Sequence, residues 1–161
     1  MFYRPENGHG LPHDPWNAIV APRPIGWIST RGTQGDNLAP YSFFNATAYV
    51  PPQVMFASTA VHAAGISEFQ AAGIASAECD SIDCPRVAGA PASLECRATR
   101  VMRLAGEANW MVLGVVTGIH IRDDCINADG AFDLRATGWL ARMGYRGDYA
   151  RVTETFEMIR P

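Results

Sequence analysis

The sequence contains no lysine, and all 13 of its basic side chains are arginine. This absence excludes Schiff-base catalysis by a lysine amine and the P-loop lysine that binds nucleotide phosphates. The net charge is −3, with no block of basic residues, so the electrostatic signature of a nucleic-acid-binding protein is missing as well. A bound phosphate would have to be met by arginine, by hydroxyl groups or by backbone amides.

Long apolar runs are also missing. No stretch approaches the roughly 20 apolar residues that a membrane-spanning helix needs, and residues 1–15 hold no apolar segment of signal-peptide length. We therefore expect a cytoplasmic protein with no membrane partner. The length of 161 residues, with 48% hydrophobic and 18% charged residues, predicts one ordinary soluble domain spanning residues 1–161.

The chain has four cysteines and no C-x-x-C pair among them. In a reducing compartment this pattern does not predict a disulfide framework. Cys79 and Cys84, in "CDSIDC", could bind a metal, but no second pair with ligand spacing follows. The simpler interpretation is a pair of reduced thiols in a loop, and no metal site is expected.

Apolar runs rich in β-branched and aromatic residues, bounded by Gly, Pro and Asn, predict strands. They span 25–30, 37–50, 53–59, 92–104 and 110–121. The polar "RGTQGD" between the first two predicts a hairpin that pairs Ser29 and Thr30 with Asn37 and Leu38. "SEFQAAGIA" (67–75) predicts one short helix with Ser67 as its cap. The fold class is therefore mainly β, an antiparallel barrel with few helices.

Alternation along 110–121 predicts two different strand faces. One face is mostly apolar and is predicted to face the core; it carries Met111, Leu113, Val115, Thr117, Ile119 and Ile121. The opposite face carries Gly114, Gly118 and His120, and paired glycines mark a place where a backbone or a flat ligand can approach closely. A structural role and a functional role for His120 both remain open.

"NLAPYSFFN" (37–45) has a proline inside an apolar run. Proline has no N–H to give to a neighbouring strand, so Pro40 is expected to end regular pairing and to leave the amides of Tyr41, Ser42 and Phe43 as free donors. Such donors beside aromatic walls suit a flat, carbonyl-rich ring such as a flavin. The alternative is a bulge at a strand edge with phenylalanines in the core.

Several motifs occur in one order over nearly the whole chain. They are "APRPIGWIST" (21–30), "DNLAPYSFFN" (36–45), "PPQVMFAST" (51–59), "GISEF" (65–69), "PRVAGAPASLECR" (85–97), "GVVTGIHI" (114–121) and "LARMGYRGDY" (140–149). Together they resemble the flavin reductase-like proteins of the FMN-binding split-barrel superfamily. The resemblance implies an antiparallel Greek-key split barrel, a homodimer with FMN near the subunit interface, and reduction of the flavin by NADH or NADPH.

The resemblance also implies site residues by position. The flavin contacts of the family carry over to Ser29, Thr30, Pro40, Tyr41, Ser42, Phe43, Asn45, Ser58 and Thr59, with Arg142 and Tyr145 near the flavin as well. Hydroxyls and the Asn45 amide would hold the ribityl chain and phosphate. His120 is the one catalytic candidate, and it would orient the nicotinamide or stabilise charge at the flavin edge.

The chain departs from the resembling proteins after "FAST". Those proteins continue with a basic-Asp-Thr or basic-Asp-Ser element that binds the phosphate, and then with helical and strand segments before "GxxEF". This chain passes through "VHAA" directly into "GISEF". We therefore expect an internal deletion after Thr59 that removes a strand-helix segment together with the cationic phosphate ligand.

Two classes of function follow from these observations. The first is NAD(P)H-dependent reduction of FMN, with the reduced flavin passed to an acceptor or a partner oxygenase. The second is a module that binds FMN or another flat ligand weakly, or a degenerate split-barrel dimer without catalysis.

Overall fold

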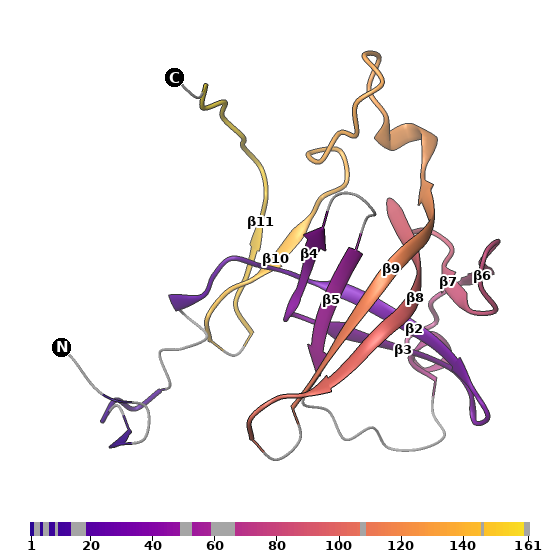
Figure 1. Ribbon diagram of the computed structural model, residues 1–161. Helices are drawn as coiled ribbons and strands as arrows, with labels where there is room; N and C mark the ends of the chain where they lie inside the picture. The colour runs from indigo at the N-terminus through magenta and orange to yellow at the C-terminus, as the bar shows by residue number, and fades with distance from the viewer. Residues whose placement is uncertain are drawn as a thin grey trace.

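The chain is built mainly of strands, as the computed structural model in Figure 1 shows. The structure describes residues 1, 4, 7–8, 10–13, 19–48, 53–58, 67–106, 109–145 and 147–159, with the backbone alone at 48, 53, 56–58 and 68. All strand pairings found there are antiparallel. This confirms the mainly β class. None of the helices described is long and apolar enough to cross a membrane.

The strands form four sheets. The largest has the order β4 (Phe44–Ala48), β5 (Gln53–Ser58), β9 (Trp110–Ile121) and β8 (Ala92–Arg103). A hairpin of β2 (Gly26–Gly32) and β3 (Gly35–Tyr41) crosses this sheet in Figure 1. A third sheet joins β1 (Arg23–Pro24), β10 (Leu140–Arg142) and β11 (Tyr149–Arg151), and a fourth joins β6 (Ser76–Glu78) and β7 (Pro85–Val87).

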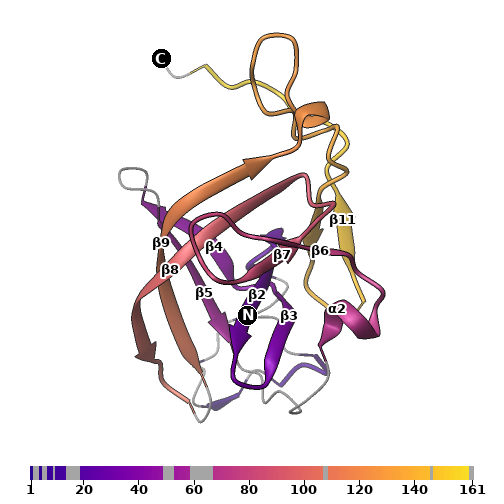
Figure 2. The same ribbon diagram turned by 90° about the vertical axis from the view of Figure 1, so that its right-hand side faces the viewer.

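Figure 2 separates these layers. The β4–β5–β9–β8 sheet lies on one side, β11 and the short helix α2 (Glu68–Ala71) lie on the other, and the β2–β3 hairpin runs between them. A 3₁₀ turn, η2 (Asp123–Cys125), follows β9. The core is small and includes Leu38, Ala39 and Phe69, which are 2%, 5% and 6% exposed.

The β2–β3 hairpin has the predicted register. Ser29 pairs with Leu38 and Thr30 with Asn37, and the turn closes where Gly32 faces Gly35. Gly35 has a φ of +104°, which only glycine adopts without strain. The pairing predicted from the "RGTQGD" loop is therefore confirmed.

The predicted strand over 37–50 is two strands, and the break is not at Pro40. Pro40 still faces Trp27, and pairing continues to Tyr41 opposite Gly26. Proline is tolerated there because β3 pairs only with β2 among the described strands, so its other edge needs no N–H donor at that position. The chain bends at Ser42 and Phe43, after which β4 begins.

The expected inner face of β9 is wrong at its far end. Ile119 and Ile121 are 57% and 42% exposed, whereas Gly114 is buried on the opposite face. A Cβ on Gly118 would lie 3.1 Å from the carboxyl group of Glu95, so the glycine makes room for a buried acid. The hydrophobic alternation predicted the wrong face here because the face covered at this end packs against the buried carboxylate of Glu95 rather than against apolar side chains.

The helix predicted over 67–75 is present but short. The Ser67 carbonyl accepts hydrogen bonds from the amides of Gln70 and Ala71 at 3.0 Å each. Gly73, with φ +63°, turns the chain out of the helix two residues after Ala71. The expected deletion after Thr59 lies at residues outside the described part of the chain.

The buried carboxylate of Glu95 holds the loop of residues 79–84 against the β8–β9 hairpin. Glu95 is 1% exposed, and it accepts hydrogen bonds from the amides of Asp80 (2.7 Å) and Ser81 (2.6 Å). The Ser81 hydroxyl and the Nε2 atom of His120 also bond to it. These donors lower the pKa of Glu95 to about 2, the Ser81 hydroxyl contributing most.

This network predicts an acid-sensitive part of the stability. The folded-state pKa of Glu95 lies below its ordinary value of 4.5, so its contribution is complete above about pH 5 and is lost as the pH falls toward 2. We expect Glu95→Gln to melt well below the native protein at pH 6, and the gap to narrow by pH 2.5. Thermal melts across that range measure it.

The matched control is Glu78→Gln. Its carboxylate is 70% exposed and pairs with Arg31, and solvent-exposed ion pairs contribute little to stability. A gap between Glu95→Gln and the native protein that stays constant with pH would contradict the role given to Glu95.

Candidate functional site

The backbone donors at the bend of Ser42 and Phe43 have no partner in the described part of the chain. Neither backbone N–H forms a hydrogen bond to any residue that the structure describes. Ser42 is half-buried and Phe43 is 41% exposed, so both lie at the surface rather than in a sealed core. Two adjacent amides that no described residue binds, placed between two strands, could donate to a flat acceptor. Pro40 and Tyr41 lead into this bend as the last two residues of β3.

The register of β4 with β5 brings Ser58 to the same edge. Phe44 pairs with Phe56, so the strand beyond Phe56 runs on toward the level of Ser42. Asn45 pairs with Met55, and its side chain is exposed. Thr59, the next expected contact, lies outside the described residues. The structure therefore groups Ser42, Phe43, Asn45 and the Ser58 backbone.

Ser29 and Thr30 lie on opposite faces of the β2–β3 hairpin because they are neighbours on a strand. The Ser29 hydroxyl donates to the carbonyl of Pro85, and the Cys84 thiol approaches the Ser29 carbonyl at 3.4 Å. Thr30 is exposed. Ser29 pairs with Leu38, and Leu38 precedes Ser42 by four residues. At about 3.3 Å per residue, Ser29 is therefore about 13 Å from the level of Ser42 along the strand.

His120 lies away from the bend. Val112 is level with Phe56 and Phe44 across the sheet, and His120 follows eight residues later, about 26 Å along β9. Its ring is hydrogen-bonded to Glu95, and Asp80 Oδ2 lies 3.7 Å from Nε2. The structure thus brings His120 to the loop of residues 79–84 and not to Ser42 and Phe43.

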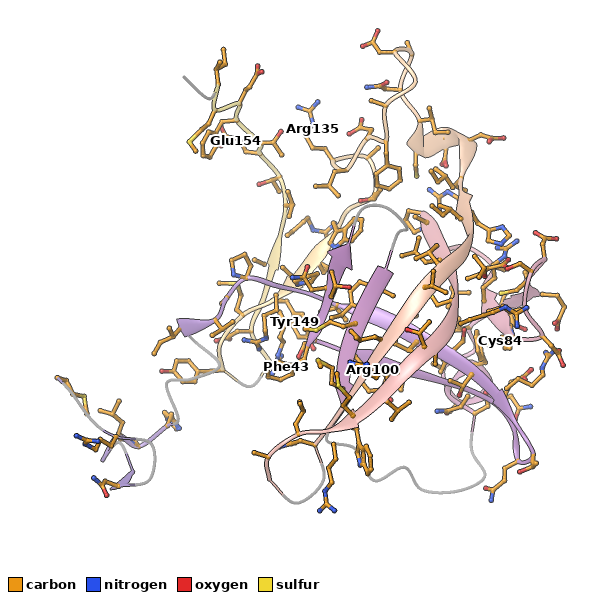
Figure 3. The ribbon with its side chains drawn as sticks, viewed as in Figure 1. Phe43, Cys84, Arg100, Arg135, Tyr149 and Glu154 are labelled. Carbon is orange, nitrogen blue, oxygen red and sulfur yellow. The ribbon has the colours of Figure 1, made fainter. Side chains whose placement is uncertain are left out.

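Two arginines stack on aromatic rings between the bend and the C-terminal sheet. The guanidinium of Arg142 lies 4.9 Å from the centre of the Tyr149 ring, and that of Arg23 lies 5.5 Å from the centre of the Phe43 ring. Arg23 and Arg142 face each other across β1 and β10. Figure 3 shows Phe43 and Tyr149 on one side of the molecule and Cys84 on the other. The candidate Arg142 therefore belongs to the side of the bend.

The residues missed by the sequence prediction are Arg23, Glu95 and the two loop partners of Glu95, Asp80 and Ser81. Arg23 is only 6% exposed and donates to the carbonyls of Val20 (2.7 Å) and Met143 (3.1 Å), so it ties the "APRP" segment to the turn after β10. Its place within a motif next to two prolines was the available signal. Tyr145, the last candidate, is 47% exposed, and its ring centre lies 5.8 Å from that of His13.

The charge of Arg31, two residues after Ser29 on β2, is already balanced by carboxylates. Arg31 binds Asp36 at 2.7 Å, Glu78 at 2.9 Å and Asp83, and these three carboxylates raise its pKa further. Arg86, one strand away, has a buried Nε atom without a hydrogen-bond partner among the described residues. Arg86 and Arg142 are therefore the better candidates for a phosphate than Arg31.

Asp80, Glu95 and His120 bring three potential metal-ligand atoms within 4.8 Å of one another. Both Glu95 oxygens, however, already accept two hydrogen bonds each, from Asp80 and His120 on one and from Ser81 on the other. A carboxylate with its acceptor positions filled is a poor metal ligand. The arrangement fits a hydrogen-bonded anchor better than a metal centre.

The cysteines are free thiols. Burial raises the pKa of Cys84, Cys96 and Cys125, and it raises that of Cys79 to about 11. Because the thiolate is the nucleophile, these groups are poorly suited to covalent catalysis at neutral pH. None of the four cysteines is therefore a good candidate for a catalytic nucleophile.

No protein-family model matches the chain. An uncharacterized protein of Deinococcus radiodurans is 34% identical over 187 positions, covering 89% of this chain and 82% of the relative. The alignment is longer than the chain's 161 residues, so the relative carries residues that this chain lacks. The comparison does not place those residues along the chain, so the internal deletion after Thr59 stays a prediction.

Solved structures match the fold at low identity. Nitrilotriacetate monooxygenase component B from Bacillus cereus superposes with a TM-score of 0.86 at 20% identity, covering 98% of both chains. An FMN-binding protein from Thermus thermophilus gives a TM-score of 0.74 at 15% identity, over 98% of this chain and 99% of the other. The chain belongs to the same family as the Deinococcus protein, and its fold is the FMN-binding split barrel of the flavin reductase-like proteins.

Proposed function

We propose that this protein binds FMN and reduces it with NADH or NADPH, and that the reduced flavin serves an acceptor or a partner oxygenase. The observation that carries the proposal is the pair of free amides at Ser42 and Phe43. They stand on the segment where the sequence resembles flavin reductase-like proteins, within a split-barrel fold. The fold neighbours, an FMN-binding protein and a monooxygenase component, support the same class.

The residues present fit a flavin. The amides of Ser42 and Phe43 would donate to the carbonyl-rich edge of the ring, and the Phe43 side chain, backed by Arg23, supplies an aromatic wall. FMN, when bound, would supply the redox chemistry, so no side-chain nucleophile is required. Thr30, Asn45 and Ser58 would bind the ribityl chain and phosphate.

Arg142 and Tyr145 have a supporting role in this proposal. Arg142 is the last residue of β10, Tyr145 follows three residues later, and Arg142 shares its side of the molecule with Phe43. The Ser29 hydroxyl is bonded to the Pro85 carbonyl, so it would not contact the flavin directly. Ser29 would instead help to hold the strand that carries Thr30. His120, held by Glu95, would act only on a ligand that extends to the loop of residues 79–84.

The second candidate is a module that binds FMN, or another flat ligand, without turnover. The expected loss of the segment after Thr59 favours it, because that segment carries the cationic phosphate ligand in the resembling proteins. Loss of that segment would leave a strand edge of the barrel without its neighbour. Because an unpaired apolar edge promotes association, we include a homodimer in the proposal.

The bend can be tested with Ser42→Trp, in which a large side chain blocks the two amides. We expect the native protein to consume NADH or NADPH when FMN is added, and Ser42→Trp to lose both FMN binding and this activity while it remains folded. Absorbance spectra with added FMN and the rate of nicotinamide oxidation measure the two properties separately.

The matched control is Ser76→Trp, at an exposed position of β6 away from the bend. It should behave as the native protein. FMN binding that survives Ser42→Trp would place the ring elsewhere. FMN binding by the native protein without nicotinamide oxidation would favour the binding module, and no FMN binding at all would favour a degenerate dimer.

The phosphate site yields a second prediction. Charge-assisted hydrogen bonds are about twice as strong as neutral ones, and Arg31 is engaged by three carboxylates. We expect FMN to bind only slightly more tightly than riboflavin, with little dependence on salt. Titration of both flavins at low and high salt measures this difference.

Tight, salt-sensitive binding of FMN with riboflavin far behind would contradict the weakened phosphate site. Arg86→Gln and Arg142→Gln would then identify the substitute cation, because only the variant lacking the phosphate ligand should bring FMN affinity down to that of riboflavin. Arg135→Gln, on an exposed loop, is the control that removes the same charge.

A further inference from the structure

Residues 153–159, after β11, form an extended C-terminal arm. It has no regular secondary structure, and Figures 1 and 2 show it leading away from the sheets. Phe156, Met158 and Ile159 are 83%, 79% and 85% exposed. Single exposed apolar residues are ordinary, but three large ones within four positions of one projecting segment indicate a missing partner surface.

An apolar pocket of about 300 Å³ lies where the arm begins. Its lining residues are Pro22, Pro24, Leu134, Trp139, Ala141 and Val152. Small-molecule sites of such size combine an apolar wall with a few convergent polar side chains, and this lining has none. The pocket therefore suits an apolar side chain better than a polar metabolite.

We propose that this pocket receives Phe156 and Met158 from the C-terminal arm of a second copy of the chain. The arm offers large apolar side chains without a place to pack, and the pocket offers an apolar lining without an occupant among the described residues. In a two-fold dimer the exchange forms the same contact twice, so both exposed arms are covered together.

The direction of the arm favours the partner's pocket over its own. Val152 lines the pocket itself, and its amide is bonded to the carbonyl of Trp139 at 3.1 Å. Only Thr153, Glu154 and Thr155 separate Val152 from Phe156, with no glycine or proline to reverse the chain. β-Branched threonine favours an extended backbone, and Figure 3 shows Glu154 out on the arm, away from the sheets.

Cysteine cross-linking tests the exchange directly. Phe156→Cys and Leu134→Cys are produced on separate chains of different mass, co-expressed, and oxidised with the native cysteines at 79 and 96 replaced by serine. We expect a disulfide-linked heterodimer. Thr155→Cys, whose side chain points to the other side of an extended arm, is the matched control and should cross-link to Leu134→Cys much less.

Both substitutions on a single chain provide the opposing test. A disulfide within one chain, with none between the co-expressed chains, would show that the arm folds onto its own pocket and would overturn the proposal. The absence of either disulfide would overturn it as well. Cross-linking does not depend on flavin, so its failure is distinguishable from failure of the proposed flavin activity.

Sedimentation gives an independent measurement. The double substitution Phe156→Ser with Met158→Ser should weaken dimerisation by about tenfold or more, as expected for removal of central apolar anchors. Because the arm is exposed and outside the sheets, we expect the double variant to keep the native fold. A far-UV circular dichroism spectrum tests this. Thr155→Ser should leave association unchanged, and a double variant that dimerises like the native protein would contradict the exchange.

Discussion

The buried carboxylate of Glu95 is the constraint on which much of this fold depends. An unpaired charge in a protein interior is very costly, so Glu95 can occupy its position only while its donors stay in place. Those donors come from the loop of residues 79–84 and from His120 on β9. Gly118 completes the arrangement, since a larger residue would meet the carboxyl group at 3.1 Å.

The anchored loop in turn sets the position of the β2–β3 hairpin. Cys84 ends the loop and Pro85 begins β7, and the contacts of both residues with Ser29 hold β7 beside β2. The far end of the same hairpin leads into the bend at Ser42 and Phe43. One end of the hairpin is thus fixed by a polar network, and the other leads to two backbone amides that no described residue binds.

Much of the fold could be predicted from the sequence because it depends on local signals. The glycines of "RGTQGD" determine the β2–β3 register, and the alternating apolar residues predict β9 with its observed bounds. The three-residue strands β6, β7, β10 and β11 were not predicted, because they are too short to show a period and form only against partners distant in the chain.

The sequence by itself determined the strand-rich class, the hairpin and the group of polar residues around Pro40, since each follows from backbone chemistry of neighbouring residues. Only the tertiary structure decided that His120 is bonded to Glu95 and lies far along β9 from the bend, that Ser29 is turned toward Pro85, and that the face carrying Gly118 and His120 is the more covered one at the far end of β9. Those outcomes depend on which distant segments donate hydrogen bonds to the buried carboxylate, and the spacing of residues along the chain does not determine which segments meet.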